Sequence, residues 1–547
     1  MIEVQQLIAS LDQGLSEEAL RDVARAQVVQ RLGISDAHIQ ELSLHRVSVD
    51  ARKKRDVHLT LSAYVDLNPK YEQRLVAGLS QSDARLVRLC QRETLKWERP
   101  QSVFLRSRPV VIGAGCAGLF AGFALAEAGL QPLIIERGDP AYERAQAIET
   151  FKTTLQLDPE SNIQFGLGGA GTFSDGKLTT GTKSAAHQLI LQSFVEAGAP
   201  REILWQAKPH IGSDILPNVV TQLVKRIQAC GGEIRFRVRL TDIELDAQGA
   251  LQALCLTTAT GEERIATKAL ILSCGHSARD IFALLQKRGI ALARKSFAMG
   301  VRIEHKQADI DKAQYGPAAG HPALGAAPYK LVAHVPHERT LFSFCMCPGG
   351  EVVAAASEQG RTVTNGASLY ARAKENANAA LLVNVNPGDL PGDDVLAGIV
   401  LQAQCEKAAY QQGLQPYQAP AQLVGDFLAQ RSSSGPHSVH PSYPLGVTWS
   451  QIEQLLPQYI ISTLRHGLPM LGNKLKPFSN PDAVLTAVES RSSSPVTILR
   501  DANCCSISTP GLYPAGEGAG YAGGIMSAAA DGIRVAQALI EQASHRS

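Results

Sequence analysis

The sequence predicts an α/β protein whose central parallel sheet is completed by two segments that lie far apart in the chain. Three stretches point to this arrangement: one begins at Val110, one ends at Gly275, and one begins at Gly511. Each contains a short apolar run near glycine, and the first and third continue into segments of helical composition. Because a strand, a tight turn and a helix form the repeating unit of a parallel sheet, the three stretches together predict the fold class.

The first stretch, VVIGAGCAGLFAGFALAEAGLQPLIIERG, has the spacing of a dinucleotide-binding loop. A β-branched run precedes Gly113, Gly115 and Gly118, and an Ala-rich segment that predicts a helix follows them. A helix N-terminus at this turn offers N–H groups to a pyrophosphate. The next predicted strand, PLIIE, leaves Glu136 to bind the hydroxyls of a ribose. An acid there disfavours a 2′-phosphate, so FAD or NAD is expected rather than NADP.

The stretch GLYPAGEGAGYAGGI and the helix predicted after it favour FAD over NAD. This pairing resembles the C-terminal FAD element of glutathione-reductase-like flavoproteins, in which an acid binds the ribityl chain and the next helix points its N-terminus at the flavin. The acid here is Glu517, where many of those families have Asp. The strand ALILSCG, ending at Gly275, is similar to the segment by which such chains return to the cofactor domain. We therefore expect non-covalent FAD.

A fourth stretch, FGLGGAGTFSDGKLTTG at 165–181, is dense in glycine and hydrogen-bonding side chains. We expect its glycines to approach the flavin, with Ser174, Asp175 or Lys177 facing the flavin ring or the substrate; the alternative is an irregular surface loop. The residues expected to contact FAD are Gly113, Gly115, Cys116, Ala117, Gly118, Glu136, Arg137, Gly168, Gly169, Gly171, Thr172, Gly275, Gly516, Glu517, Gly523, Gly524 and Ile525.

Three side chains are candidates for the chemistry beside the flavin. Lys177 is assigned an electrostatic role that favours the reduced anionic flavin, with a solvated lysine as the alternative. His276 is a candidate proton relay or a structural histidine. Arg491 is expected to hold a carboxylate or phosphate, or else to form a structural ion pair with Glu489 or another acid.

The ten cysteines are scattered and show neither C-x-x-C nor the C-x₄-C of flavin disulfide reductases. Dithiol exchange is therefore not expected. Cys345 and Cys347, in FSFCMCPGG, are interpreted as buried thiols on a strand, with a redox or substrate-contact role as the alternative. No cysteine spacing indicates an iron–sulfur or zinc site, so no metal is expected.

Length and composition predict a soluble protein of several domains. The chain has 547 residues, a net charge of +2 and 19% charged residues, so no overall field points to nucleic acid or an anionic membrane. Its N-terminus has no basic region followed by an apolar core, and no apolar run is long enough to span a membrane. A cytoplasmic location is expected.

Four regions are predicted along the chain: a small N-terminal α+β domain at 1–95, the first part of the FAD-binding domain with a β-meander at 106–290, a mixed α+β substrate domain at 291–495, and the second part of the FAD-binding domain at 496–547. The cofactor domain is thus a discontinuous, three-layer, Rossmann-like α/β fold into which the substrate domain is inserted.

Local patterns describe the two flanking domains. Ser16 is expected to cap a helix that stops at Gly33, and the alternation at 57–67 predicts a half-buried strand. The basic run at 51–55 is interpreted as a hairpin tip, with a nucleic-acid contact as the alternative. In the substrate domain FAMGVRIEH predicts a strand and SLYARAKENANAALL predicts a helix.

Long strings throughout the chain resemble the bacterial FAD-dependent dehydrogenases of unknown substrate, also described as NAD(P)/FAD-dependent oxidoreductases. These strings are VDARKKRDVHL, FGLGGAGTFSDGKL, CGHSARD, MGVRIEHKQADID, FCMCPGG, TNGASLYARAKENANAALLV, AVESRSSSPV and GLYPAGEGAGYAGGI. The resemblance implies FAD and a glutathione-reductase-like cofactor fold, and it supplies no substrate.

The predicted function is hydride transfer between a small organic substrate and FAD. No second G-x-G-x-x-G follows a predicted strand, so NADH or NADPH is expected only as a diffusible electron donor. Two alternatives remain at this stage: a flavoprotein acting on tRNA or another RNA through the N-terminal domain, and a non-catalytic flavin redox sensor.

Overall fold

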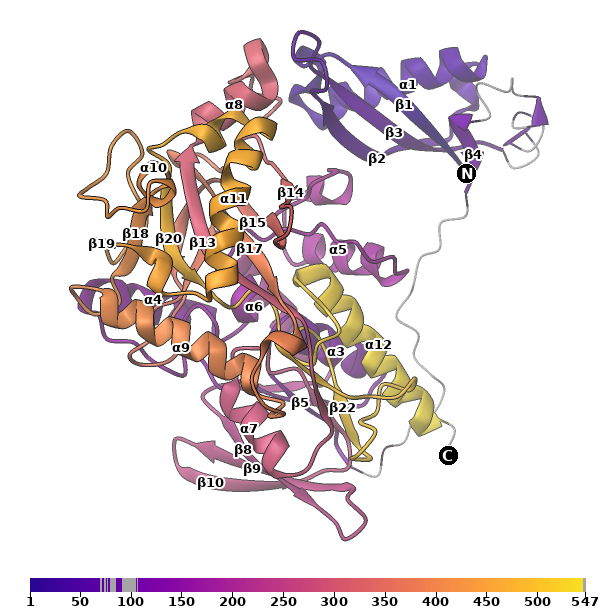
Figure 1. Ribbon diagram of the computed structural model, residues 1–547. Coiled ribbons are helices and arrows are strands. Elements are labelled where there is room, and N and C mark those ends of the chain that lie inside the picture. The colour runs from indigo at the N-terminus through magenta and orange to yellow at the C-terminus, as the bar shows by residue number, and fades with distance from the viewer. Residues whose placement is uncertain are drawn as a thin grey trace.

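The computed structural model describes residues 1–68, 71–72, 75, 77–78, 85–90, 105 and 107–544. The chain forms an N-terminal domain, a cofactor domain made of two separate stretches, and a domain built on a large mixed sheet (Figure 1). The domain boundaries expected at 95 and 106 lie outside the described residues.

The N-terminal domain is a four-stranded antiparallel sheet with one long helix. Its strands are β1 (Ile2–Ala9), β2 (Glu41–Asp50), β3 (His58–Asp66) and β4 (Val87–Leu89), in the order β2-β3-β1-β4, and its helix is α1 (Glu17–Leu32). Ser16 Oγ accepts a hydrogen bond from the Ala19 N–H at 3.1 Å, and Gly33 ends the helix in the left-handed region at φ 61°. Both predicted caps are confirmed. The basic run at 51–55 joins β2 to β3 and is the predicted hairpin tip.

The cofactor domain contains a five-stranded parallel sheet in the order β22-β11-β5-β6-β7. The strands are β5 (Val110–Ile112), β6 (Leu133–Ile135), β7 (Glu233–Arg235), β11 (Leu270–Leu272) and β22 (Leu512–Pro514). Leu270 pairs with Val110 on one side and with Leu512 on the other. Strands from 110, 270 and 512 therefore lie side by side, as the three apolar runs predict.

Two different layers cover this sheet. One face carries the helices α3 (Cys116–Glu127), α6 (Leu216–Ala229) and α12 (Ile525–Ser544), which share an apolar core with it. The other face packs against α7 (Arg279–Lys287) and a three-stranded meander of β8 (Arg239–Leu245), β9 (Leu251–Thr258) and β10 (Gly261–Ala266). Figure 1 shows α12 alongside α3 with the meander below the sheet. The domain also includes α4 (Ala141–Thr154) and α5 (Ala186–Glu196).

The third domain is built on a mixed sheet in the order β14-β15-β17-β13-β20-β18-β19, with β16 paired to β15. Its strands are β13 (Phe297–Lys306), β14 (Val332–His334), β15 (Thr340–Ala354), β16 (Thr364–Ala367), β17 (Asn376–Val385), β18 (Ala419–Leu423), β19 (Val447–Trp449) and β20 (Val484–Glu489). Its helices are α8 (Gln307–Tyr315), α9 (Ala397–Gln412), α10 (Val424–Leu428) and α11 (Gln458–Lys474). A two-stranded ribbon of β12 (Leu292–Arg294) and β21 (Val496–Ile498) marks where the chain enters and leaves this domain.

The two faces of the large sheet differ in chemistry. Along β13, Val301 and Ile303 belong to the apolar core that α11 completes. Arg302 and Glu304 alternate with them and are also buried. Because the second face is both polar and enclosed, its groups need partners within the protein, and Arg302 finds one in Glu489 on β20 at 2.9 Å.

One sequence prediction about this domain is wrong. The segment 368–382, expected to be helical, forms a turn and then most of β17. Strand β17 is paired with β13 on one side and β15 on the other, and Asn376 Nδ2 donates to Glu304 Oε1 at 3.0 Å. These neighbours outweigh the Ala-rich helical composition, because pairing in the middle of a sheet satisfies the backbone on both edges of the strand.

The N-terminal domain contacts both of the other domains. The Val47 N–H donates to the Trp205 carbonyl at 2.8 Å, and Lys54 in the basic run packs close to Gly316. Of the helices in the described part of the chain, none combines the length and apolar character needed to cross a bilayer.

Candidate active site

The first glycine turn joins β5 to α3 and has little free space. Gly113 has φ 96°, and a side chain there would collide with the backbone of Ser273. A Cβ on Gly118 would collide with the Gly113 carbonyl, so this glycine lets the helix pack on the turn. Gly115 differs from both, because an added Cβ would have its nearest neighbour 3.8 Å away, at Gly169 Cα. The open side of the turn is therefore at Gly115.

The start of α3 has no side-chain cap, because its N-cap residue is Gly115. The first-turn N–H groups around Cys116 and Ala117 are thus left for another acceptor, and the helix dipole favours an anion there. Burial and the nearby Glu517 raise the pKa of Cys116 to about 12, so its thiol is protonated.

Glu136 follows β6, and its carboxylate forms hydrogen bonds with three backbone segments. Its carboxylate accepts hydrogen bonds from the N–H groups of Ala114 at 2.8 Å, Gly138 at 2.9 Å and Gly166 at 3.0 Å. A carboxylate offers about four lone-pair positions, so one remains for a ribose hydroxyl. The neighbouring Arg137 is engaged by Glu160 and Asp280.

The glycine-rich loop lies directly on the first turn. The Gly168 N–H donates to the Ala114 carbonyl at 2.8 Å, and Gly168 forms an isolated parallel bridge with Gly115. Gly171 faces α12, since an added Cβ would lie 3.2 Å from Ile525 Cγ1. Thr172 closes the turn by donating its hydroxyl to the Leu167 carbonyl at 3.0 Å.

The loop is held by a buried arginine that sequence reasoning missed. Arg144 on α4 donates to the carbonyl oxygens of Asn162 at 2.8 Å, Ile163 at 2.9 Å and Leu167 at 2.7 Å. Full burial lowers the pKa of this guanidinium to about 10. The sequence contains only a weak signal for this role, because a single arginine in a predicted helix does not indicate which carbonyl groups it will contact.

The third stretch brings the C-terminal element to the same place. Gly516 has φ 77°, and an added Cβ would lie 2.6 Å from Ala117 Cβ on α3. The Gly516 N–H donates to Asp531 on α12 at 2.8 Å. Gly275 closely approaches Gly518, while Gly523 and Gly524 have open space before α12 begins at Ile525. The structure therefore brings the expected cofactor residues of all four stretches together.

Glu517 and His276 face each other within this site. Their side chains are 26% and 11% exposed, and His276 Nε2 lies 3.8 Å from Glu517 Oε1. Partial burial raises the pKa of Glu517 to about 7, against a hydrogen bond from the Gly524 N–H that lowers it. Burial, together with the charges of Arg491 and Arg279, lowers the pKa of His276 to about 3. His276 is therefore neutral near pH 7, whereas Glu517 changes protonation there.

Lys177 lies at the junction of the glycine-rich loop and the large sheet. Its Nζ is 3.1 Å from Asp175 Oδ2 and 4.0 Å from Cys347 Sγ on β15. Burial would lower the pKa of Lys177, but Cys347 and Asp175 together raise it. Asp175 is also paired with Arg372, and the two cations hold its pKa at about 2 against burial. Lys177 is thus an ammonium placed between a carboxylate and a thiol.

Arg491 forms a structural ion pair. Its Nε and Nη2 donate to Glu406 at 3.0 Å each, and its Nη1 donates to Ser357. Each guanidinium nitrogen therefore has a protein acceptor, and the group is 2% exposed. The acid is Glu406 on α9 rather than Glu489, which pairs with Arg302. This environment does not support the expected carboxylate or phosphate contact.

The basic run at 51–55 also has protein partners. Arg52 donates to Asp50 on the same hairpin, and Lys54 packs near Gly316. In the described part of the chain, no group of three or more His, Cys, Asp or Glu side chains is arranged to hold a metal ion.

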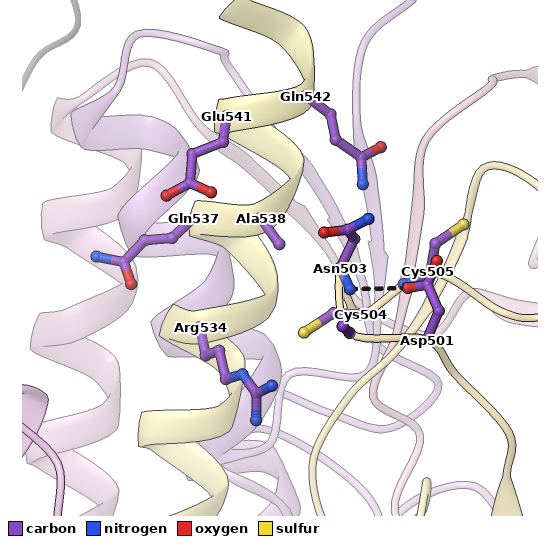
Figure 2. A pocket seen from close by; sticks show the side chains of 10 residues that line it. Asp501, Asn503, Cys504, Cys505, Arg534, Gln537, Ala538, Glu541 and Gln542 are labelled. Atoms are coloured by element: carbon purple, nitrogen blue, oxygen red, sulfur yellow. Dashed lines mark hydrogen bonds between the residues drawn. The ribbon is translucent and has the colours of Figure 1, made fainter. Parts of the chain in front are cut away.

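A separate pocket of about 700 Å³ lies between α12 and the turn at 501–505 (Figure 2). Arg534, Gln537 and Glu541 project from α12, and Asn503 and the adjacent cysteines come from the turn. The pocket includes none of the residues expected to contact a dinucleotide, so it is distinct from the site described above.

Comparisons with known proteins assign the cofactor. An FAD binding domain family matches residues 107–274, a family described as FAD-dependent protein, C-terminal domain-like, matches 296–492, and a domain of unknown function matches 1–66. A protein of Clostridium beijerinckii, described as an uncharacterized protein, is 40% identical over 542 residues and 99% of each chain is covered. The cofactor of this chain is FAD.

Several solved structures are similar at low sequence identity. A flavin-dependent brominase has 12% identity, with 80% of this chain and 79% of that chain covered and a TM-score of 0.39. A 3-ketosteroid dehydrogenase from Rhodococcus jostii has 12% identity, 81% and 98% coverage and a TM-score of 0.35. A geranylgeranyl bacteriochlorophyll reductase-like protein from Thermoplasma acidophilum has 10% identity, 80% and 79% coverage and a TM-score of 0.34.

The residues of the site fit FAD. The turn is open at Gly115, the first turn of α3 is uncapped, and Glu136 retains a free acceptor position. Open space also surrounds Gly523 and Gly524 at the start of α12, where a second helix dipole is available. These features provide one recognition element for each end of a dinucleotide.

Proposed function

The chain belongs to the same protein family as the Clostridium beijerinckii relative and uses FAD, and on that premise we propose that it is a dehydrogenase acting on a small organic substrate. When bound, FAD supplies hydride transfer. The side chains around it supply binding, orientation and proton transfer. The observation that carries the proposal is the pairing of Glu517 with the neutral His276 before α12.

Glu517 is the proton-exchanging group in this proposal. Its pKa of about 7 divides it between the protonated and ionised forms near neutral pH, which is the condition for efficient general acid–base catalysis. His276 stays neutral and lies 3.8 Å from the carboxyl group, so it adds no positive charge that would keep Glu517 ionised. A substrate that loses or gains a hydride also exchanges a proton, and in this proposal the Glu517 carboxyl group takes up or releases that proton.

The remaining residues have binding roles in this proposal. The turn from Gly113 to Gly118 and the start of α3 would hold the pyrophosphate, and Glu136 would hold a ribose. The N-terminus of α12 would stabilise negative charge on the flavin. Lys177 would add a positive charge on the side of the large sheet. The cofactor is held non-covalently, and the flavin would be recycled by a diffusible partner: an electron acceptor if the organic substrate is oxidised, or NADH or NADPH as the donor if it is reduced.

Anaerobic reduction of the purified flavoprotein tests the proposal. We expect the flavin absorbance to bleach on addition of NADH or NADPH, or of a small organic substrate acting as the reductant. Bleaching by a nicotinamide alone would direct the search to an organic acceptor. A flavin that persists with both nicotinamides and with a panel of alcohols, amines and acids would overturn the dehydrogenase assignment and favour a redox sensor.

A further inference from the structure

Two cysteines of β15 lie in an irregular part of the strand. Between Phe344 and Cys347 the pairing of β15 with β17 shifts register, because three steps along β15 face two steps along β17. Cys345 lies inside this bulge with φ 41°, a left-handed conformation that is uncommon for a residue with a side chain. The bulge therefore changes the direction of the side chains here, as bulges beside functional sites commonly do.

The bulge brings the two thiols together. Cys347 Sγ lies 3.3 Å from the carbonyl oxygen of Cys345, to which its S–H donates, so the inner thiol lies directly against the backbone of the outer one. Cys347 is fully buried, whereas Cys345 is partly exposed. Cys345 is thus the more exposed residue of the pair, and Cys347 is the enclosed one.

Two cations face this pair of thiols. Lys177 Nζ lies 4.0 Å and Arg302 Nη1 lies 3.9 Å from Cys347 Sγ. Arg302 is fully buried and comes from β13, while Lys177 comes from the glycine-rich loop of the cofactor domain. Positive charge beside a sulfur stabilises the thiolate, which is the reactive form of cysteine.

The two thiols have pKa values that are shifted in opposite directions. The hydrogen bond from Cys347, followed by the charges of Lys177 and Arg302, holds the pKa of Cys345 well below its usual range. The same hydrogen bond and burial raise the pKa of Cys347. The pair therefore loses its first proton readily and its second reluctantly, with the thiolate on the exposed sulfur.

Other cysteines in the described part of the chain have the opposite environment. Burial raises the pKa of Cys274 and of Cys405 to about 12. Burial and the neighbouring Glu244 raise the pKa of Cys255. Among the described cysteines with shifted pKa values, Cys345 alone is shifted downward.

We propose that Cys345 and Cys347 form a thiol–disulfide exchange centre that is oxidised by a small-molecule disulfide. Because the sequence lacks C-x-x-C and C-x₄-C, dithiol exchange was not expected from it. The C-x-C spacing alone does not predict that the two cysteines lie against each other, and the bulge in β15 is what places them so. The inference goes beyond the proposed function, because the exchange requires no hydride donor or acceptor.

The reaction proceeds in two balanced steps. The Cys345 thiolate attacks one sulfur of the small-molecule disulfide, whose S–S bond breaks and releases a thiolate. Cys347 then attacks the Cys345 sulfur and gives up its proton, and the mixed disulfide breaks to release the second small thiol. Two electrons pass from the cysteine pair to the small molecule, one S–S bond is lost and one is formed.

The test uses the full-length protein loaded with FAD. The protein is reduced, freed of reductant and incubated with glutathione disulfide, and its peptides are then mapped by mass under non-reducing conditions. We expect the peptide that contains both cysteines to lose two hydrogen atoms and to regain them with dithiothreitol. Two free thiols, or a glutathione adduct that persists on wild-type Cys345, would overturn the proposal.

Matched variants identify the role of each sulfur. In Cys347→Ser the mixed disulfide should accumulate on Cys345, because the resolving thiol is absent. In Cys345→Ser neither product should form, and the control Cys255→Ser should behave like the wild type. Accumulation of an adduct on Cys347 in Cys345→Ser would contradict the assignment of Cys345 as the attacking sulfur.

Substitution of Lys177 tests whether its positive charge favours ionisation of the Cys345 thiol. Lys177→Met should move the pH at which the first attack reaches half of its limiting rate upward by about one unit, since loss of a neighbouring positive charge raises the pKa of a thiol. The rate is followed by the release of the first small thiol. An unchanged pH profile would overturn the role assigned to Lys177, and the wild-type peptide map decides on the disulfide even if a variant fails to fold.

Discussion

Glu406 and Glu517 are two enclosed glutamates whose pKa values are shifted in opposite directions. Glu406 is 0% exposed and Glu517 is 26% exposed, so burial alone would raise the pKa of Glu406 more. Instead the pKa of Glu406 is held at about 2, while that of Glu517 is raised to about 7. Charged partners, rather than depth, therefore decide the protonation state of these two groups.

The partners explain the contrast. Glu406 accepts hydrogen bonds from Arg279 at 2.7 and 2.9 Å and from Arg491 at 3.0 Å. Glu517 has a backbone N–H at 3.3 Å and the neutral His276 at 3.8 Å. Glu406 therefore stays ionised and joins α7, α9 and the segment after β20, whereas Glu517 is free to exchange a proton.

The largest expected effect is the loss of FAD binding when the first glycine turn is filled. Gly115→Trp should abolish retention of FAD, because the new side chain fills the open side of the first turn. The ratio of flavin to protein absorbance measures this. Gly388→Trp, at an exposed glycine with no atom within 4 Å of an added Cβ, should retain full flavin occupancy. A fully loaded Gly115→Trp protein would show that the turn is not the pyrophosphate site.

The next largest effect should come from Glu406. Glu406→Gln leaves the buried Arg279 and Arg491 with the partly exposed Glu358 as their remaining carboxylate partner, which is expected to reduce the free energy of unfolding by about 3–5 kcal/mol. Urea denaturation of the apoprotein and of the flavoprotein measures the change. Glu262→Gln, on the exposed part of the meander, should leave the midpoint within experimental scatter. Equal stability of the two variants would refute a structural role for Glu406.

The pH dependence of stability should follow the direction of these shifts. The pKa of Glu406 is lowered from 4.5 to about 2, so its contribution of about 3 kcal/mol is present above pH 4.5 and is lost as the pH falls toward 2. Glu517 has the opposite sign, because its contribution is present below pH 4.5 and is lost as the pH rises through 7. Urea midpoints of the wild type, Glu406→Gln and Glu517→Gln across pH would separate the two, and parallel curves would contradict both assignments.

The smallest effect is expected on the surface. Arg52 is 89% exposed and pairs with Asp50, so Arg52→Gln should leave the urea midpoint of unfolding within experimental scatter. The same variant tests the RNA alternative, since a nucleic-acid contact at the hairpin tip would give salt-dependent binding that weakens on neutralisation. We expect negligible RNA binding by the wild type and by Arg52→Gln alike.

The cofactor site could be predicted from the sequence because its signals are local. Gly113, Gly115 and Gly118 require only the strand before them and the helix after them, and Glu517 lies within one glycine-rich stretch. The Ser16 cap is local in the same way. In each case the physical constraint and the residues that satisfy it lie within one turn of the chain.

The chemistry around the flavin was harder to predict because its partners are distant in sequence. Arg491 meets Glu406 across 85 positions, and Lys177 meets Cys347 across 170. The helix expected at 368–382 was wrong because both edges of β17 are paired with other strands. A single sequence carries no record of such pairings, so the raised pKa of Glu517, on which its proposed role rests, also emerged only from its surroundings.

The measurement that tests the central claim most directly is the pH dependence of anaerobic flavin reduction in the wild type and in Glu517→Gln. We predict an inflection near pH 7 in the wild type and its loss in Glu517→Gln, with FAD retained and reduction slowed by about 10²-fold or more. An inflection that persists unchanged in Glu517→Gln would contradict the account, because the proton would then be exchanged by another group.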